Sequence, residues 1–293
     1  MESVKIETNK YLHKYTTLRI GGSAEWLSEP KDIKELKFLL SWAKKKHISC
    51  NIIGAGSNLL INDRKIKGLS LCMRKFNGCD INPITGEIEV FGGESLPNLA
   101  RKAANAGLHG LEWAIGIPGT IGGAIVMNAG AQGGCIAERI KTIQVIPKEG
   151  GHPFEMSPKD LEFSYRNSRL QHEELIVISG RFKLDPGHSQ ETINRITKLN
   201  LNKRTTTQPY HQPSCGSVFR NPEPLKAGQL IDNLGLKGIR MGGAEVSTIH
   251  GNFIINRSNA KASDFHDLVS LIQKKIFNAY GVLLHTEVKE LGF

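Results

Sequence analysis

The sequence has little cysteine: five residues in 293, with no two of them spaced as C-x-x-C. An odd number without that spacing gives neither a disulfide framework nor a zinc motif. None of the ten histidines falls in an H-E-x-x-H motif or another ligand spacing. These absences predict a reduced compartment and no protein-bound metal.

Long apolar runs are also missing, and none reaches the roughly 20 residues that span a membrane. The N-terminus shows no charged region followed by the apolar stretch of a signal peptide. We therefore expect a cytoplasmic protein with no membrane partner.

The net charge of +10 is the strongest compositional signal. The basic residues are spread along the chain, and the densest cluster, Lys44–Lys46, falls at the end of a predicted helix, where cations suit the helix dipole. No basic stripe is interleaved with aromatic residues. The charge thus favours an anionic small molecule over the alternative of a nucleic acid, which we do not expect to bind.

A glycine-rich, uncharged stretch runs from Gly116 to Ala131. Glycines among aliphatic residues predict a buried loop that turns with positive φ and approaches a flat or anionic group closely. The N–H groups of such a loop can hold a phosphate, and the hydroxyl of Thr120 can donate to the same ligand. The alternative is a tight turn between core strands.

A second candidate phosphate loop, Gly54-Ala55-Gly56-Ser57-Asn58, follows the predicted strand Cys50–Ile53. It is not the dinucleotide fingerprint G-x-G-x-x-G, because Leu59 stands where the third glycine belongs. A G-x-G alone is a weak signal.

Hydrophobic periodicity and turn residues predict mixed helices and strands, hence an α+β protein. The first half contains a helix from Pro30 to about His47, a hairpin within 69–92, a helix capped by Ser95 and ended by Gly107, and strands over 140–146 and 175–183. The second half contains a helix capped by Ser189 with Ile193, Ile196 and Leu199 on one face, and a loop over 205–217. A helix capped by Ser263 and ended by Gly281 follows, and then a terminal strand over 283–291.

Three polar clusters fall in loops or beside strand ends: Tyr165–Arg169, Gly216–Phe219 and His285–Val288. An arginine in the first suits a substrate carboxylate, whereas the alternative is a solvated surface arginine. Ser217 is placed like a reactive hydroxyl, but no G-x-S-x-G elbow surrounds it, so hydrolase chemistry is poorly supported. Glu287 is a carboxylate in an apolar strand. Each cluster taken alone is compatible with a structural role.

Taken together and in order, these segments resemble the UDP-N-acetylenolpyruvoylglucosamine reductase family over nearly the whole chain. The resemblance rests on Gly54–Leu60, Gly116–Ala131, Ser164–Ser168, Gly216–Pro222 and Glu287-Val288, with further matches at Gly235–Gly238 and Gly242–Ser247. The form without the long tyrosine-bearing insertion fits best, because the span from Arg166 to Ser217 is short.

The resemblance implies an FAD-binding region of the vanillyl-alcohol-oxidase type over residues 1–183, in two subdomains divided near residue 70. A smaller α+β substrate-binding domain is implied over 184–293, with its terminal strand returning to the active site. A monomer is expected. FAD is expected to be non-covalent, and NADPH is the co-substrate. The implied cofactor contacts are Gly54, Ala55, Gly56, Ser57, Asn58, Leu59, Pro118, Gly119, Thr120, Gly122, Gly123, Asn128, Gly130 and Arg204.

The implied reaction reduces an enolpyruvyl ether of a UDP-sugar to UDP-N-acetylmuramate, a precursor of peptidoglycan. NADPH reduces FAD, and flavin N5 then delivers hydride to the vinyl carbon C3. Arg166 is expected to hold the substrate carboxylate, Glu287 to stabilise the enolate-like intermediate, and Ser217 to protonate C2. Tyr165 and Asn221 are candidate substrate contacts.

Two positions depart from the family pattern: Gln132 where tyrosine is common, and Cys135 where an acidic residue is common. Cys215 is interpreted as small filler and not as a nucleophile. The remaining alternatives are an oxidase of the same flavin fold, which often tethers FAD to histidine or cysteine, and a non-enzymatic nucleic-acid-binding protein.

Overall fold

The computed structural model describes residues 4–293, and the chain divides into two compact units. The first unit contains the residues up to Glu7, Trp26–Ala55 and Gly68–Lys203, and the second contains Thr8–Glu25, Gly56–Lys67 and Arg204–Phe293. Each unit buries its own apolar side chains. The two units are therefore interleaved in sequence, and the second is built from three separate segments.

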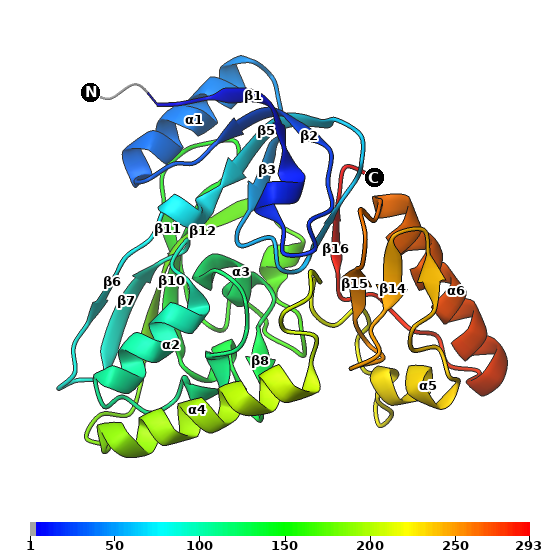
Figure 1. Cartoon of the computed structure of the whole chain (residues 1–293). Coiled ribbons are helices and arrows are strands. Elements are labelled where there is room, and N and C mark those ends of the chain that lie inside the picture. Colours follow the sequence, from blue (N-terminus) through cyan, green and yellow to red (C-terminus); the bar gives the residue numbers. More distant parts are fainter. Residues whose placement is uncertain (1–3) are drawn as a thin grey trace. The chain divides into compact units, whose positions relative to one another are not determined.

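Helix α1 (Ile33–Lys45) opens the main part of the first unit (Figure 1). Asp32 caps it by accepting from Lys34 N and Glu35 N at 2.8 and 2.9 Å. The buried face of α1 packs against β5 (Ile66–Cys72), which pairs in parallel with β3 (Cys50–Ile53). With β1 (Glu7–Tyr11) and β2 (Ser23–Ser28), the strand order of this sheet is β1-β2-β5-β3.

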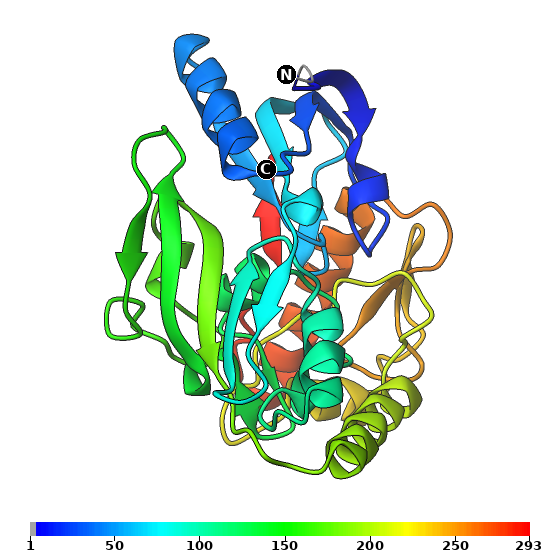
Figure 2. The ribbon, with the colours of Figure 1, turned by 90° about the vertical axis from the view of Figure 1, so that its left-hand side faces the viewer.

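A five-stranded sheet lies within the first unit, with the order β11-β10-β12-β7-β6 and antiparallel neighbours throughout (Figure 2). Its strands are β6 (Cys79–Ile81), β7 (Glu87–Phe91), β10 (Ile140–Pro147), β11 (Phe154–Met156) and β12 (Leu175–Lys183). Buried residues of helices α2 (Leu96–Asn105) and α3 (Ile121–Val126) share one apolar core with this sheet. The short pair β8 (Gly130–Ala131) and β9 (Gly134–Cys135) follows α3, and α4 (Gln190–Thr207) runs on to the second unit.

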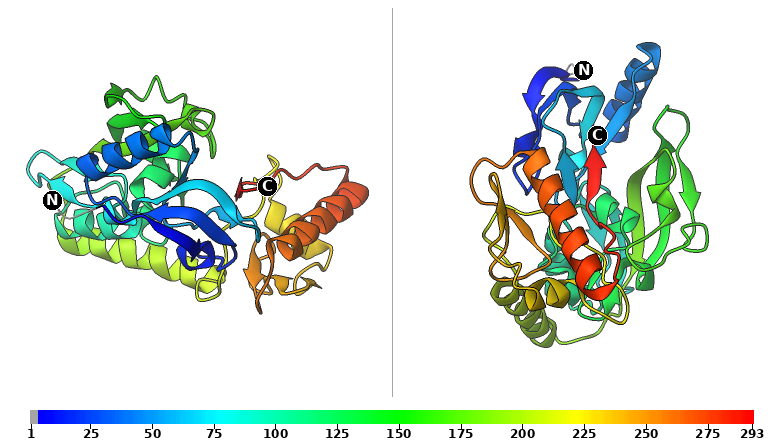
Figure 3. Two further views of the ribbon diagram at one scale, coloured as in Figure 1. Left: turned by 90° about the horizontal axis from the view of Figure 1, so that it is seen from above. Right: turned by 90° about the vertical axis from the view of Figure 1, so that its right-hand side faces the viewer.

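The second unit is organised around helix α6 (Ala262–Tyr280), which lies along a small antiparallel sheet (Figure 3). Phe265, Leu268 and Ile272 of the helix share a core with Ala244 and Ile254 of the sheet. The sheet has the order β13 (Arg240–Met241), β14 (Ala244–Val246), β15 (Ile254–Asn256), and α5 (Ala227–Asn233) adds to the same core. Strand β16 (Lys289–Leu291) pairs in parallel with β4 (Leu59–Ile61), so the last residues are joined to a segment from the first quarter of the chain.

Most of the predicted elements are confirmed. Ser95 caps α2 by accepting from Asn98 N at 3.4 Å, and Ser189 accepts from Thr192 N at 3.4 Å at the start of α4. The strands predicted over 140–146 and 175–183 correspond to β10 and β12. Gly281 ends α6 in the left-handed conformation, with φ +66°.

Two predictions in the middle of the chain were wrong. The glycine-rich stretch is not a loop throughout, because Thr120 caps a helix that continues to Val126. Helix α4 runs to Thr207, so the three threonines predicted as loop lie in its last turn. Its buried face is formed by Ile193 and Thr197, while Leu199 is 58% exposed.

Two predictions near the C-terminus were also wrong. Ser263 does not cap α6; the helix begins one residue earlier, where Ala262 N donates to the carboxylate of Asp63 at 2.9 Å. Asp264 also accepts from Lys261 N at 3.0 Å, whereas the contribution of Asp63, so distant in the chain, leaves no local pattern. The terminal strand is shorter than predicted and covers only Lys289–Leu291.

No helix within residues 4–293 is long and apolar enough to cross a membrane. In the same residues, no group of three or more His, Cys, Asp or Glu side chains is placed to hold a metal ion.

Candidate active site

The first glycine loop leaves β3 directly, and its backbone is held from two sides. A Cβ at Gly54 would lie 2.5 Å from Thr120 Oγ1, so only glycine allows the two loops to approach this closely. The carbonyl of Ala55 accepts a hydrogen bond from Arg74 Nη2 at 2.6 Å. The loop is thus bare backbone packed against the hydroxyl of Thr120.

The same loop continues into the second unit from Gly56 to Leu59. Gly56 has φ +67°, and a Cβ there would meet the carbonyl oxygen of Tyr15 at 2.0 Å. Asn58 Nδ2 donates to Glu287 O at 3.1 Å, and Lys289 N donates to Asn58 O at 3.0 Å. Within the second unit, Asn58, a predicted cofactor contact, therefore lies beside the backbone of Glu287, a predicted catalytic residue.

The second glycine loop, Pro118–Gly123, is held by the segment just before α2. Leu96 N donates to Gly119 O at 3.0 Å, Ile121 N to Glu94 O at 2.9 Å, and Gly122 N to Gly92 O at 2.7 Å. Thr120 Oγ1 accepts from Gly123 N at 3.4 Å and so caps α3. Both glycine loops therefore meet at Thr120, inside the first unit.

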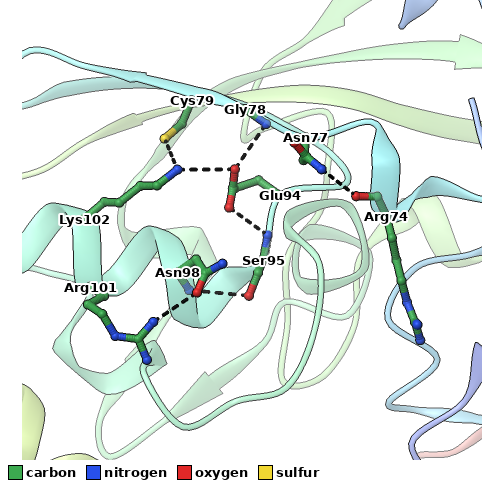
Figure 4. Close-up of polar contacts among 9 residues, drawn as sticks. All are labelled: Arg74, Asn77, Gly78, Cys79, Glu94, Ser95, Asn98, Arg101 and Lys102. Carbon is green, nitrogen blue, oxygen red and sulfur yellow. Dashed lines mark hydrogen bonds and ion pairs between the residues drawn. The ribbon is translucent and has the colours of Figure 1, made fainter. Parts of the chain in front are cut away.

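The carboxylate of Glu94 is buried and points toward Gly78, Ser95 and Lys102 (Figure 4). It accepts from Gly78 N at 3.1 Å and Ser95 N at 3.2 Å, and Lys102 Nζ lies 3.5 Å away. A buried carboxylate needs such partners to remain charged. Its charge is thus balanced locally, without the glycine loop.

Arg166 stands at the tip of a two-residue turn closed by reciprocal 3.1 Å hydrogen bonds between Ser164 and Asn167. Its φ is +53°, a left-handed conformation that costs a non-glycine residue about 1–2 kcal/mol. The guanidinium Nη2 donates to Gly130 O at 2.5 Å, and Cζ lies 5.2 Å from the centroid of the half-exposed Tyr165 ring.

Asn128 joins this turn to the glycine-rich stretch. Its Nδ2 donates to Ser164 O at 2.9 Å, and its Oδ1 accepts from Ala137 N at 3.1 Å. Both hydrogen bonds use the buried side chain. The first unit thus brings together Asn128, Gly130 and Arg166, three residues predicted from sequence.

Ser217 and Glu287 lie on two neighbouring extended segments of the second unit. Glu287 N donates to Val218 O at 2.8 Å, and Arg220 N donates to His285 O at 2.9 Å. The buried amide of Asn252 accepts from Phe219 N at 2.9 Å and donates to Phe219 O at 2.8 Å. The loop that carries Ser217 is therefore clamped two residues further on.

Two groups in this part of the second unit, a thiol and an ammonium group, have pKa values shifted from their ordinary ones. Burial raises the pKa of the Cys215 thiol to about 12, which excludes it as a nucleophile at neutral pH and supports its interpretation as small filler. Burial, together with the nearby Arg220, lowers the pKa of Lys289. Two basic residues, Arg220 and Lys289, thus lie on the two segments that carry Ser217 and Glu287.

Two further predicted residues have structural contacts. The Oδ1 atom of Asn221 accepts from Ala227 N at 3.1 Å, at the start of α5. Arg204 lies in the last turn of α4, where its carbonyl accepts from Gln208 N at 3.0 Å. Arg166 belongs to the first unit, whereas Ser217, Asn221 and Glu287 belong to the second.

Comparison with known proteins decides the family. A family model for the C-terminal domain of UDP-N-acetylenolpyruvoylglucosamine reductase matches residues 208–291, and a model for an FAD binding domain matches residues 24–154. A reductase of that name from Prochlorococcus marinus (strain MIT 9313) is 56% identical over 293 residues, which cover 100% of this chain and 95% of the relative. The chain belongs to the UDP-N-acetylenolpyruvoylglucosamine reductase family.

Two further members of the reductase family are similar to this chain over all or nearly all of its length. A relative from Prochlorococcus marinus (strain NATL2A) is 57% identical over 100% of both chains. The crystal structure of the Thermus caldophilus reductase superimposes with a TM-score of 0.82 at 33% identity, covering 99% of each chain. These matches confirm the predicted family, the α+β fold of the vanillyl-alcohol-oxidase type and the FAD-containing oxidoreductase class.

The two glycine loops fit the flavin cofactor of the reductase family. A side chain at Gly54 would clash with Thr120, and a Cβ at Gly122 would lie 3.1 Å from Gly92 O. Both positions therefore lack side chains, and a cofactor can approach their backbone closely. The buried carboxylate of Glu94 is paired with Lys102. Three anchoring residues were not predicted from the sequence. Arg74 holds the first glycine loop, Gln171 the turn of Arg166, and Asn252 the loop of Ser217.

Proposed function

We propose that this chain reduces the enolpyruvyl ether of UDP-N-acetylglucosamine to UDP-N-acetylmuramate, with Arg166, Ser217 and Glu287 as its catalytic residues. The observation that carries the proposal is the match to named reductases over the full length of the chain. FAD held at the glycine loops would supply the hydride transfer from NADPH to the vinyl carbon of the substrate. The protein acts as a cytoplasmic monomer in this proposal.

In this reaction Arg166 binds the substrate carboxylate through the two parallel N–H groups that a guanidinium offers. The same charge offsets the enolate that develops beside the carboxylate after hydride addition. Glu287 helps to stabilise the enolate-like intermediate as part of its hydrogen-bonding frame. The left-handed backbone of Arg166 supports this role, because strained residues persist where surrounding contacts hold a functional conformation.

Ser217 donates the proton that C2 of the substrate requires. A serine hydroxyl is a weak acid, so it needs nearby positive charge to act in this way. Arg220 and Lys289 supply that charge on the two segments that carry Ser217 and Glu287. The pKa of Lys289 is lowered first by its burial and then by the nearby Arg220. The short, hydrogen-bonded approach of Glu287 N to Val218 O supports the pairing of these residues.

The cofactor contacts are proposed at the two glycine loops: Gly54, Ala55, Gly56, Ser57, Asn58, Leu59, Pro118, Gly119, Thr120, Gly122 and Gly123, with Asn128, Gly130 and Arg204 nearby. Residues 1–183 form the FAD-binding domain in this proposal and residues 184–293 the substrate domain. The ranges matched by the two family models, 24–154 and 208–291, lie inside these bounds and support them.

A visible spectrum recorded without oxygen tests the proposal. The purified protein should show the bands of oxidised flavin, lose them on addition of NADPH, and regain them when the enolpyruvyl sugar nucleotide is added. Trichloroacetic acid should release all of the yellow colour into the supernatant, because the flavin is not tethered. Recovery only with oxygen would contradict the substrate, and a colourless protein that takes up no FAD would contradict the whole proposal.

A further inference from the structure

Besides Asn128, which holds Ser164 O, the side-chain amide of Gln171 fastens the turn that presents Arg166 to the rest of the first unit. Gln171 Nε2 donates to the carbonyl oxygen of Arg166 at 3.1 Å and to the carbonyl oxygen of Val126 at 3.1 Å. An amide nitrogen has two hydrogens, so these two bonds use its full donor capacity. Ser168 Oγ adds a third link by donating to Val126 O at 2.7 Å.

The position of Val126 gives these bonds their significance. Helix α3 begins at Ile121, directly after its cap Thr120, and ends at Val126. The two ends of this one short helix therefore contact different parts of the site: Thr120 and Gly123 at the glycine loop, and Val126 at the Arg166 turn. A helix of this length is a rigid connection between them.

The left-handed backbone of Arg166 makes the carbonyl contact decisive. A non-glycine residue leaves this conformation unless its neighbours hold it. The carbonyl oxygen of Arg166 is held by Gln171, while its guanidinium reaches Gly130 O at 2.5 Å and Cζ lies 5.2 Å from the Tyr165 ring centroid. Without the amide, the peptide can rotate toward ordinary φ and carry the guanidinium with it.

We propose that Gln171 is a positioning residue of the reductase: it locks the Arg166 peptide to the end of α3 and thereby fixes the direction of the guanidinium. The inference rests on the proposed role of Arg166 and deepens it. It predicts that the second half-reaction, in which the enolpyruvyl carboxylate must be held, depends on Gln171. The first half-reaction with NADPH does not.

The test compares Gln171→Leu, which has a similar shape but no donor, with Gln171→Lys, which can donate to both carbonyls. Gln144→Leu, on an exposed position of β10, is the matched control. In Gln171→Leu, reoxidation of the reduced flavin by substrate should slow about tenfold or more and the KM for that substrate should rise. FAD content and the rate of reduction by NADPH should stay within about twofold of wild type.

Recovery of the substrate half-reaction in Gln171→Lys would support donation as the cause. Wild-type rates in Gln171→Leu, or equal losses in both half-reactions together with lost FAD, would overturn the proposal. Failure of the wild-type protein itself to be reoxidised by substrate would instead refute the proposed function, and so the two failures can be told apart.

A second measurement needs no turnover. Phenylglyoxal labels arginine side chains, and peptide mass spectrometry reports Arg166 and Arg169 separately. Labelling of Arg166 should accelerate about threefold in Gln171→Leu, because the turn opens more often. Arg169, whose Nε donates to Glu173 at 2.5 Å outside the turn, should react as in wild type. Unchanged labelling of Arg166 would overturn the positioning role whatever the substrate is.

Discussion

The Ser217→Ala protein is expected to be reduced by NADPH at the wild-type rate and to be reoxidised by the enolpyruvyl substrate about 10²–10⁴-fold more slowly. The hydroxyl is the proposed proton donor to C2, and removing a positioned general acid has an effect of this size. The hydroxyl takes no part in the reaction with NADPH, so the loss should be confined to one half-reaction.

Stopped-flow absorbance of the flavin, with each half-reaction started separately, measures this difference. Ser263→Ala, an exposed position on α6, is the control for the serine-to-alanine change itself. Equal slowing of both half-reactions would indicate a displaced cofactor, and an unaffected substrate half-reaction would assign the proton donor elsewhere.

The largest effect on stability is expected for Asn252→Leu. Asn252 is 3% exposed, and its amide satisfies both the N–H and the carbonyl of Phe219. Leucine has a similar volume but leaves two buried backbone groups unpaired, at about 1–3 kcal/mol each. The free energy of unfolding of the second unit should therefore fall by about 2–6 kcal/mol.

Urea unfolding followed by circular dichroism measures the change, with Asn233→Leu at the exposed end of α5 as the matched control. The control should stay within about 0.5 kcal/mol of wild type. Asn252→Asp keeps the acceptor for Phe219 N but loses the donor to Phe219 O, so its loss should fall between the two. Equal stability of the leucine variant and the control would show that the two hydrogen bonds between Asn252 and Phe219 are dispensable.

Local sequence patterns predicted those parts of the fold that depend on neighbouring residues. The apolar face of α6 follows from its 3.6-residue period, and Ser95 and Ser189 mark helix starts because their hydroxyls accept from backbone groups three residues away. The glycine loops were located by their lack of side chains. Leu199 shows the limit of such patterns, because periodicity identifies a face without saying whether another element covers it.

The anchors of the site could not be predicted, since each joins residues far apart in the sequence. Arg74 reaches Ala55, Asn252 reaches Phe219, and Asp63 caps a helix that starts at Ala262. A side chain that bonds to a distant backbone group can be almost any polar type, so no spacing marks it. The interleaving of the units could not be predicted either, because it depends on contacts between residues far apart in the sequence.

The parallel pairing of β4 with β16 has a consequence for biosynthesis. Leu59 emerges from the ribosome long before Lys289, its partner in the register. At about 5–20 residues per second, β4 waits roughly 10–45 s for its partner strand to be translated. During that interval the strand presents unpaired N–H and C=O groups to any neighbouring chain. The nascent protein thus passes through a period of exposure to aggregation that ends only with its last few residues.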